Sequence, residues 1–244
     1  MKILNKLSFF FGFLILFVFS ANNNAWAPYY AASVYKVTVY RLSACVDGST
    51  LSECESPAMI GHSDAGVTMD IAVTDVGASA GSLGNINNLK IGTKYTYGEV
   101  VIDRQFTMKG EGADNNGGNI CRTDSGATAG DEDNWAVGVK DGGTPTEQTL
   151  YVATNTSQGL QVNSTDQKDG LGSDSDDDQF DDGHLYMKFR WELKKPYVFD
   201  GMIPSLYIEF DVSRALGIYG NCLTGGNNAN GITPEKPIIT NYFQ

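Results

Sequence analysis

Apolar and polar residues alternate through most of this chain after its first thirty residues. In residues 185–193 the odd-numbered positions hold Leu, Met, Phe, Trp and Leu, whereas the even-numbered positions hold Tyr, Lys, Arg and Glu. Successive side chains of a strand point to opposite faces, so a period of two predicts a strand with one buried face and one wet face. Strands of this kind are typical of antiparallel sheets.

The same alternation recurs along the chain and predicts a protein built almost entirely of strands. In one segment it is interrupted on the apolar face by Arg104. Shorter strands are expected at residues 135–139, 150–153 and 238–243, and at most a helical turn is expected near residues 214–218. Besides residues 185–193, the expected inward-facing residues are Tyr35, Val37, Val39, Val67, Met69, Ile71, Val73, Val100, Ile102, Phe106, Met108, Leu206, Ile208, Phe210 and Val212.

Three long segments between these strands are rich in Gly, Asn and Asp, and we expect them to be loops. They are residues 110–134, 163–183 and 220–234. Such residues favour turns and bury little apolar surface. The predicted fold class is all-β: an antiparallel β-sandwich, jelly-roll or Ig-like, of about eight to ten strands with long Gly/Asn/Asp-rich loops. A closed sheet of about eight strands in an outer membrane is the alternative, and the four cysteines favour the sandwich.

The first 27 residues have the composition of a signal peptide. Two lysines precede an apolar run over residues 7–19, which is shorter than the about 20 residues that a membrane-spanning helix needs. Residues 25–27 give an A-x-A cleavage pattern, and cleavage after Ser20 is the alternative. We therefore expect an exported protein at the cell surface, in the extracellular space or in the periplasm. Its mature chain, residues 28–244, would form a single domain without a transmembrane helix.

The charge balance is acidic, with 17 Lys and Arg against 29 Asp and Glu and a formal net charge of −12. Removal of the leader, which holds two lysines and no acid, changes this charge to −14. Such a balance argues against a nucleic-acid partner, because phosphate binding needs a basic surface. Phosphate-loop, dinucleotide-binding and zinc-protease motifs are also absent from the sequence.

Half of the mature net charge lies in residues 163–184, where aspartates at alternate positions mark a candidate metal site. Asp174, Asp176 and Asp178 have a D-x-D-x-D spacing, and Asp182 follows them. Ca²⁺ prefers carboxylate oxygens in this arrangement, but the loop lacks the central Gly and the final Glu of an EF-type loop. We expect either a Ca²⁺ site here or a solvated acidic loop with diffuse counterions.

The four cysteines all follow the leader and predict two disulfides in an exported chain. Of the three pairings that four cysteines allow, we favour the one in which Cys45 and Cys54 close a short polar loop. Cys121 and Cys222 then pair by elimination and join two distant Gly/Asn-rich segments. Metal binding by these cysteines is disfavoured, because C-x2-C spacing and histidine partners are missing.

Catalytic candidates are weak, and we expect no enzyme. Residues 77–81 match G-x-S-x-G, but a Gly/Asn segment follows where a nucleophile elbow needs a helix. Glu99 with Asp103, and Glu209 with Asp211, form carboxylate pairs on the expected wet faces of strands. A glycosidase uses two carboxylates at a comparable separation, but the wet face of any acidic sheet looks the same. Both histidines lie in polar segments and are expected at the surface.

The start of the mature chain points most directly to function. Residues 28–45 form an extended, apolar segment directly after the leader, and such a terminal strand can complete the sheet of a neighbouring molecule. Repeated head to tail, that contact builds an open filament. An ordinary first strand within the chain's own sandwich is the alternative. The residues expected to make the donated contacts are Tyr29, Tyr30, Tyr35, Val37 and Val39.

Together these patterns predict an exported, disulfide-bonded structural or assembly protein, a filament subunit that self-associates by β-strand addition. The alternative is a Ca²⁺-dependent glycan-binding module, adhesin-like or lectin-like, because outward tyrosines beside polar groups suit sugar rings. A secreted hydrolase ranks last. Apart from Ca²⁺ we expect no cofactor.

Overall fold

The computed structural model describes residues 29–73, 88–114, 119–131, 133–140, 143–152, 162–165, 167–168, 184–202, 206–222 and 230–243. The expected leader and the G-x-S-x-G segment lie outside these residues. So do the four candidate Ca²⁺ ligands, Asp174, Asp176, Asp178 and Asp182.

Within the described residues the chain forms fourteen strands and no α-helix, and its strand pairs are antiparallel. The all-β class predicted from the alternation is thus confirmed. The strands outnumber the expected eight to ten because several have only two to four residues. They are β1 (Tyr29–Tyr30), β2 (Ala32–Val46), β3 (Ala58–Asp70), β4 (Lys94–Asp103), β5 (Gln105–Ala113), β6 (Ile120–Arg122), β7 (Val139–Lys140), β8 (Gln148–Tyr151), β9 (Val162–Thr165), β10 (Tyr186–Val198), β11 (Leu206–Asp211), β12 (Leu216–Tyr219), β13 (Gly231–Pro234) and β14 (Ile238–Phe243).

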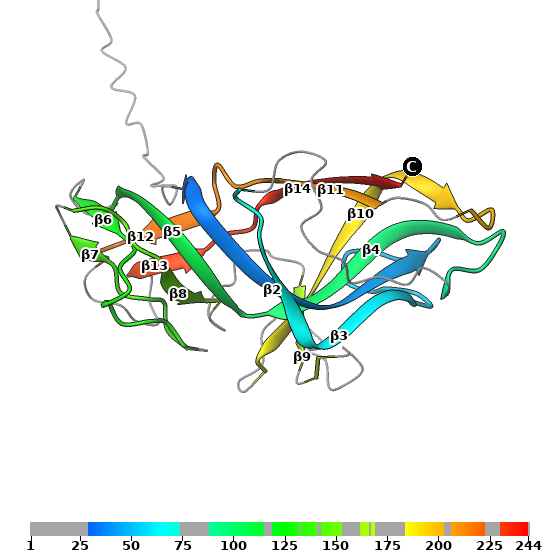
Figure 1. Ribbon diagram of the computed structural model, residues 1–244, viewed down its shortest axis with the longest axis horizontal. Helices are drawn as coiled ribbons and strands as arrows, with labels where there is room; N and C mark the ends of the chain where they lie inside the picture. The colour runs from blue at the N-terminus through cyan, green and yellow to red at the C-terminus, as the bar shows by residue number, and fades with distance from the viewer. Residues whose placement is uncertain are drawn as a thin grey trace, which may run out of the picture.

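The first layer is a nine-stranded sheet with β2 at its centre (Figure 1). β3 runs along one side of β2, and β4 followed by β5 runs along the other side. Beyond β4 the sheet continues with β10 and β9, and beyond β5 it continues with β8, β6 and β7. The central strand therefore connects the two ends of an elongated molecule.

An extra residue in β2 reverses which side chains face the core. Val39 pairs with Ile102, and Arg41 pairs with the residue immediately before Ile102, so Tyr40 is a bulged residue. Tyr35, Val37 and Val39 face the other layer, as the alternation predicts. Odd-numbered residues from Arg41 to Cys45 lie instead on the outer face. The bulge explains why an arginine follows a regular apolar series.

Arg104 marks the point between β4 and β5 where the neighbouring strand of the sheet changes from β10 to β8. It lies between β4 and β5 and is fully buried; its amide donates to the Leu185 carbonyl, and its own carbonyl accepts from the Val152 amide. Its guanidinium donates to the Val152 carbonyl at 3.0 Å from Nε and 2.8 Å from Nη2, and to the His184 carbonyl at 2.6 Å from Nη1. One side chain therefore holds the chain on both sides of residues 153–183.

The second layer is a long hairpin that is broken in its middle. β11 pairs with β14 and β12 pairs with β13, and the registers of the two pairings differ by one residue. The break falls at residues 212–215 and 235–237. β1 adds to the free side of β12. In Figure 1, β12 and β13 lie at one end of the molecule, and β11 and β14 extend toward the other.

The hydrophobic core lies between these layers and confirms the predicted sandwich. Leu185 and Val73 are exceptions to the predicted pattern: both lie outside the strands and are 52% and 66% exposed. Buried residues of β10 belong to the same cluster as buried residues of β12 and β13. They are Met187, Phe189, Trp191, Leu193, Leu216, Ile218 and Ile232.

Several expectations about individual segments are wrong. Residues 214–218, expected as a helical turn, include the start of β12, and the expected loops contain β6, β13 and most of β9. The outer face of β10 was expected to be wet, but Lys188 and Arg190 are only 7% and 4% exposed. A loop that begins at the far end of β2 reaches this face, because Arg190 donates to the Ser52 carbonyl at 2.8 Å. The described part of the chain contains no helix with the length and apolarity that a membrane crossing requires.

Candidate functional site

The five residues expected to mediate assembly fall into two groups. Tyr35, Val37 and Val39 are 3–7% exposed and lie in β2, the central strand of the chain's own sheet. Tyr29 and Tyr30 form β1, which pairs with β12 in the other layer. The chain thus crosses from one layer to the other at Ala31, between the two strands. β2 is therefore an integral strand of the large sheet, whereas β1 is a two-residue strand on the free side of β12.

Tyr30 lies against a glycine that leaves room for its ring. A Cβ atom at Gly112 of β5 would collide with that ring. The Tyr30 hydroxyl donates to the Ala113 carbonyl at 3.0 Å. A Cβ atom at Gly110, two residues earlier, would lie 3.0 Å from the Ala31 carbonyl oxygen. Because neither glycine has a side chain, the N-terminal segment packs directly on the backbone of β5 at both positions.

Tyr29 packs on an aromatic cluster at the same end of the molecule. The rings of Trp135 and Tyr219 have centroids 4.7 Å apart, and Tyr29 packs against this pair. The Arg214 guanidinium lies 5.0 Å from the centroid of the Tyr29 ring. In the strand ladder Tyr29 is the partner of Gly217. Each tyrosine of β1 thus has its own set of contacts, which together we call the β1 seat.

A carboxyl group belongs to the β1 seat. Glu235 lies at the break of the hairpin, and the Tyr219 hydroxyl donates to its Oε1 at 2.6 Å. A Cβ atom at Gly217 would lie 2.5 Å from the same oxygen, so the glycine makes room for the acid. Burial raises the pKa of Glu235 to about 7, and the hydrogen bond from Tyr219 opposes this shift.

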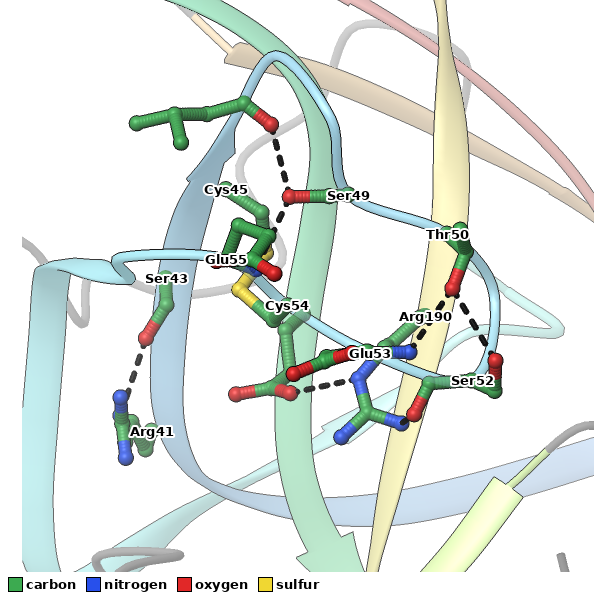
Figure 2. Close-up of polar contacts among 12 residues, drawn as sticks. Arg41, Ser43, Cys45, Ser49, Thr50, Ser52, Glu53, Cys54, Glu55 and Arg190 are labelled. Carbon is green, nitrogen blue, oxygen red and sulfur yellow. Dashed lines mark hydrogen bonds and ion pairs between the residues drawn. A yellow bond between two sulfur atoms is a disulfide. The ribbon is translucent and has the colours of Figure 1, made fainter.

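At the other end of β2, the Cys45–Cys54 disulfide closes a loop whose polar groups bond to one another (Figure 2). The Ser49 hydroxyl donates to the Val46 carbonyl at 2.7 Å and accepts from the Glu55 amide at 3.0 Å. These bonds give the loop a defined shape, because its backbone groups find partners within it.

A buried ion pair lies beneath this loop (Figure 2). Arg190 Nε and Glu99 Oε2 are 2.7 Å apart, and their side chains are 4% and 5% exposed. The Ser52 carbonyl of the loop accepts from the same guanidinium, and Arg41 donates to the Ser43 hydroxyl nearby at 2.9 Å. Glu99, expected on a wet face, is therefore paired inside the protein.

The remaining candidate catalytic groups have separate partners. Asp103 accepts from the Tyr40 hydroxyl at 3.1 Å, and burial raises the pKa of Asp103. Asp211 is exposed, and hydrogen bonds from Ser213 lower its pKa. His62 lies at hydrogen-bond distance from Asp64, with 2.9 Å between Nε2 and Oδ1. The Asp103 and His62 pairs share a neighbour, because Lys168 donates to the Asp64 carbonyl at 2.9 Å and lies 5.0 Å from the centroid of the Tyr40 ring.

The two disulfides have the pairing that the sequence favoured, Cys45 with Cys54 and Cys121 with Cys222. The Asp114 carboxylate lies within 4.8 Å of the second pair of sulfurs. Because these sulfurs are bonded to each other, they offer no thiolates to a metal ion. The disulfides indicate an oxidising, exported environment.

Comparisons with protein families, curated proteins and solved structures found no match to this chain.

Several residues of the β1 seat, among them Gly112, Tyr219 and Glu235, are not predicted from the sequence. Gly112 had a signal, because glycines at alternate strand positions indicate close approach of another segment. Trp135 had none, because its ring partner Tyr219 is distant in sequence, and Glu235 had none, because its contact with Tyr219 depends on the register of β12 and β13.

Proposed function

We propose that this chain is an exported structural or assembly protein of the cell surface or extracellular space, which self-associates by β-strand addition. Two disulfides and a leader-like N-terminus support export. The elongated sandwich, cross-linked by two disulfides, supports a structural role. Charged side chains of the described residues, such as Arg190 and Glu99, are paired with each other inside the protein.

The β1 seat is the observation that carries this mechanism. β1 has two residues, begins at the second residue of the expected mature chain, and is separated from β2 by the exposed Ala31. Its attachment depends on Tyr30 against Gly112 and on Tyr29 against the aromatic cluster. The same two tyrosines of a second copy would make identical contacts, which is the condition for strand exchange. Copies that each pass β1 to the next copy form an open filament.

A designed disulfide tests this mechanism. Tyr30→Cys combined with Gly112→Cys places two sulfurs where the ring now packs on the glycine, and locks β1 to its own chain. We expect the mature chain to form assemblies larger than a monomer as its concentration rises in light scattering. The locked variant should remain monomeric, as should a chain that lacks residues 28–33.

A matched control links the same sheet without holding β1. Lys36 and Thr107 are register partners on β2 and β5, so Lys36→Cys with Thr107→Cys should leave assembly unchanged. Filaments in electron micrographs of the locked variant, equal to those of the natural chain, would refute strand addition through β1.

A Ca²⁺-dependent glycan-binding module is the second candidate, and the position of Arg104 favours it. Arg104 bonds to the chain on both sides of residues 153–183, which contain the four aligned aspartates. Fixed ends reduce the entropy lost when a loop orders around an ion. Calorimetry with millimolar Ca²⁺ should show binding that Asp174→Asn with Asp176→Asn removes. Absence of binding heat in the natural chain would eliminate this candidate.

A further inference from the structure

We infer that Glu235 controls the docking of β1, so that ionisation of its carboxyl group releases the N-terminal strand from β12. This inference rests on the proposed role of β1 in assembly and adds its regulation. It predicts a strand that is held firmly in mildly acidic solution and exchanges more readily in mildly alkaline solution.

A chain of hydroxyl contacts connects the acid to the strand. The Tyr219 hydroxyl donates to Glu235 Oε1 at 2.6 Å, and the hydroxyls of Tyr219 and Tyr29 are also hydrogen-bonded. Gly217, the ladder partner of Tyr29, is also the residue whose missing side chain makes room for the carboxyl group. Tyr29 therefore lies close to Glu235 through both the backbone ladder and the side chains.

Among the residues that the structure describes, the groups that face Glu235 from neighbouring strands are phenols and not cations. Besides the two phenols of β1 and β12, the Tyr35 hydroxyl of β2 donates to the backbone carbonyl of Glu235 at 3.1 Å. The neighbouring cations are placed over rings: Arg214 at 5.0 Å from the centroid of Tyr29, and Lys236 at 4.7 Å from that of Phe189. A negative charge on Glu235 would thus be stabilised only by the hydrogen bond from Tyr219 and by water molecules that reach the carboxylate.

Ionisation and docking are therefore linked. With β1 in place the pKa of Glu235 is about 7, raised by burial from the ordinary carboxyl value of 4.5. Undocking lets water reach the carboxylate and returns its pKa toward the ordinary value. The docked state binds the proton more tightly, so docking weakens as pH rises between these two values and stays weak above the higher one. Full coupling reduces the docking constant about tenfold between pH 6 and pH 8.

Hydrogen exchange measures this effect directly. We expect protection factors of the β1 and β12 amides, corrected for intrinsic exchange, to fall about tenfold from pH 6 to pH 8 in the mature chain. Glu235→Gln keeps the shape of the side chain and removes its titration, so its protection should be equal at both values. Glu209→Gln, on β11, is the matched control and should behave like the natural chain.

A second variant keeps the inference testable if Glu235→Gln folds poorly. Tyr219→Phe removes the hydrogen bond that lowers the pKa of Glu235, so the loss of protection should end at higher pH. An equal fall in Glu235→Gln, an unmoved transition in Tyr219→Phe, or constant protection in the natural chain would overturn the inference.

The experiment is separable from assembly. Exchange is measured on dilute monomer, so it reports on Glu235 even if no filament forms. Conversely, a chain that assembles and is blocked by the Tyr30→Cys with Gly112→Cys lock, yet shows no pH effect, retains strand addition and loses only its regulation.

Discussion

The two ends of this molecule are each held by a disulfide, but the two bonds do different work. Cys45–Cys54 spans nine residues and shapes a loop that covers the outer face of the large sheet. Cys121–Cys222 spans 101 residues and joins β6 of the large sheet to the segment that follows β12 in the other layer. The first bond is local, whereas the second holds the sandwich together at the end that carries the β1 seat.

This difference has an expected size. In the chain-entropy model, closing a loop of about 100 residues stabilises the folded state by about 4.7 kcal/mol, and closing a loop of about ten residues by about 2.7 kcal/mol. The short disulfide has a second role besides loop closure. Its loop covers the buried Arg190–Glu99 ion pair, which must stay shielded from water.

The largest effect is expected from the long disulfide. Cys121→Ser with Cys222→Ser should lower the free energy of unfolding by about 4 to 5 kcal/mol, because the unfolded chain gains the freedom of the opened loop. Urea denaturation of the monomeric chain measures this loss. A loss below that of the short disulfide would show that the layers are held mainly by their apolar contacts.

The next effect belongs to the opposite end. Glu99→Ala removes the carboxylate partner of a buried guanidinium and should cost about 3 to 5 kcal/mol. Replacing both members, Glu99→Leu with Arg190→Met, should cost much less, because no charge is then buried. The same urea titration compares the two variants. Equal losses would mean that the ion pair itself, and not the avoidance of a lone buried charge, stabilises this end.

The sequence could predict the strands but not the coverage of their faces. Alternation located the buried side of β10 because burial there follows directly from the period of two. It failed for Arg190, because the residues that cover this face belong to a loop some 140 positions away. The bulge at Tyr40 was equally hidden, since a single extra residue leaves the local composition unchanged.

The residues of the candidate site likewise fall into those that the sequence indicates and those that it does not. Tyr29 and Tyr30 stood out by their position after the leader, and the cysteine pairing followed from loop length and elimination. Glu235 could not be found in this way. Its environment is created by the register of β12 and β13, which brings Gly217 and Tyr219 of the neighbouring strand to it.

A smaller effect is expected from the short disulfide. Cys45→Ser with Cys54→Ser should lower the free energy of unfolding by about 2.7 kcal/mol. It should also raise hydrogen exchange in residues 49–55, because the loop then loses its closure. If exchange at Arg190 rises as well, the loop is what keeps the ion pair buried. If only the loop responds, neighbouring parts of the sheet suffice.

At the surface, substitutions at the two ends of the molecule should have similarly small effects on stability. Lys36 pairs with Glu147 at 2.7 Å near the β1 end, and Lys94 pairs with Asp47 at 3.1 Å beside the short loop; all four side chains are 34–60% exposed. Exposed ion pairs contribute about 0 to 1 kcal/mol, since water and salt screen them. Lys36→Ala and Lys94→Ala should each change stability by less than about 1 kcal/mol in urea titrations, and less still in 1 M salt. A larger loss in either variant would mean that this end depends on surface charge as well as on its covalent and buried bonds.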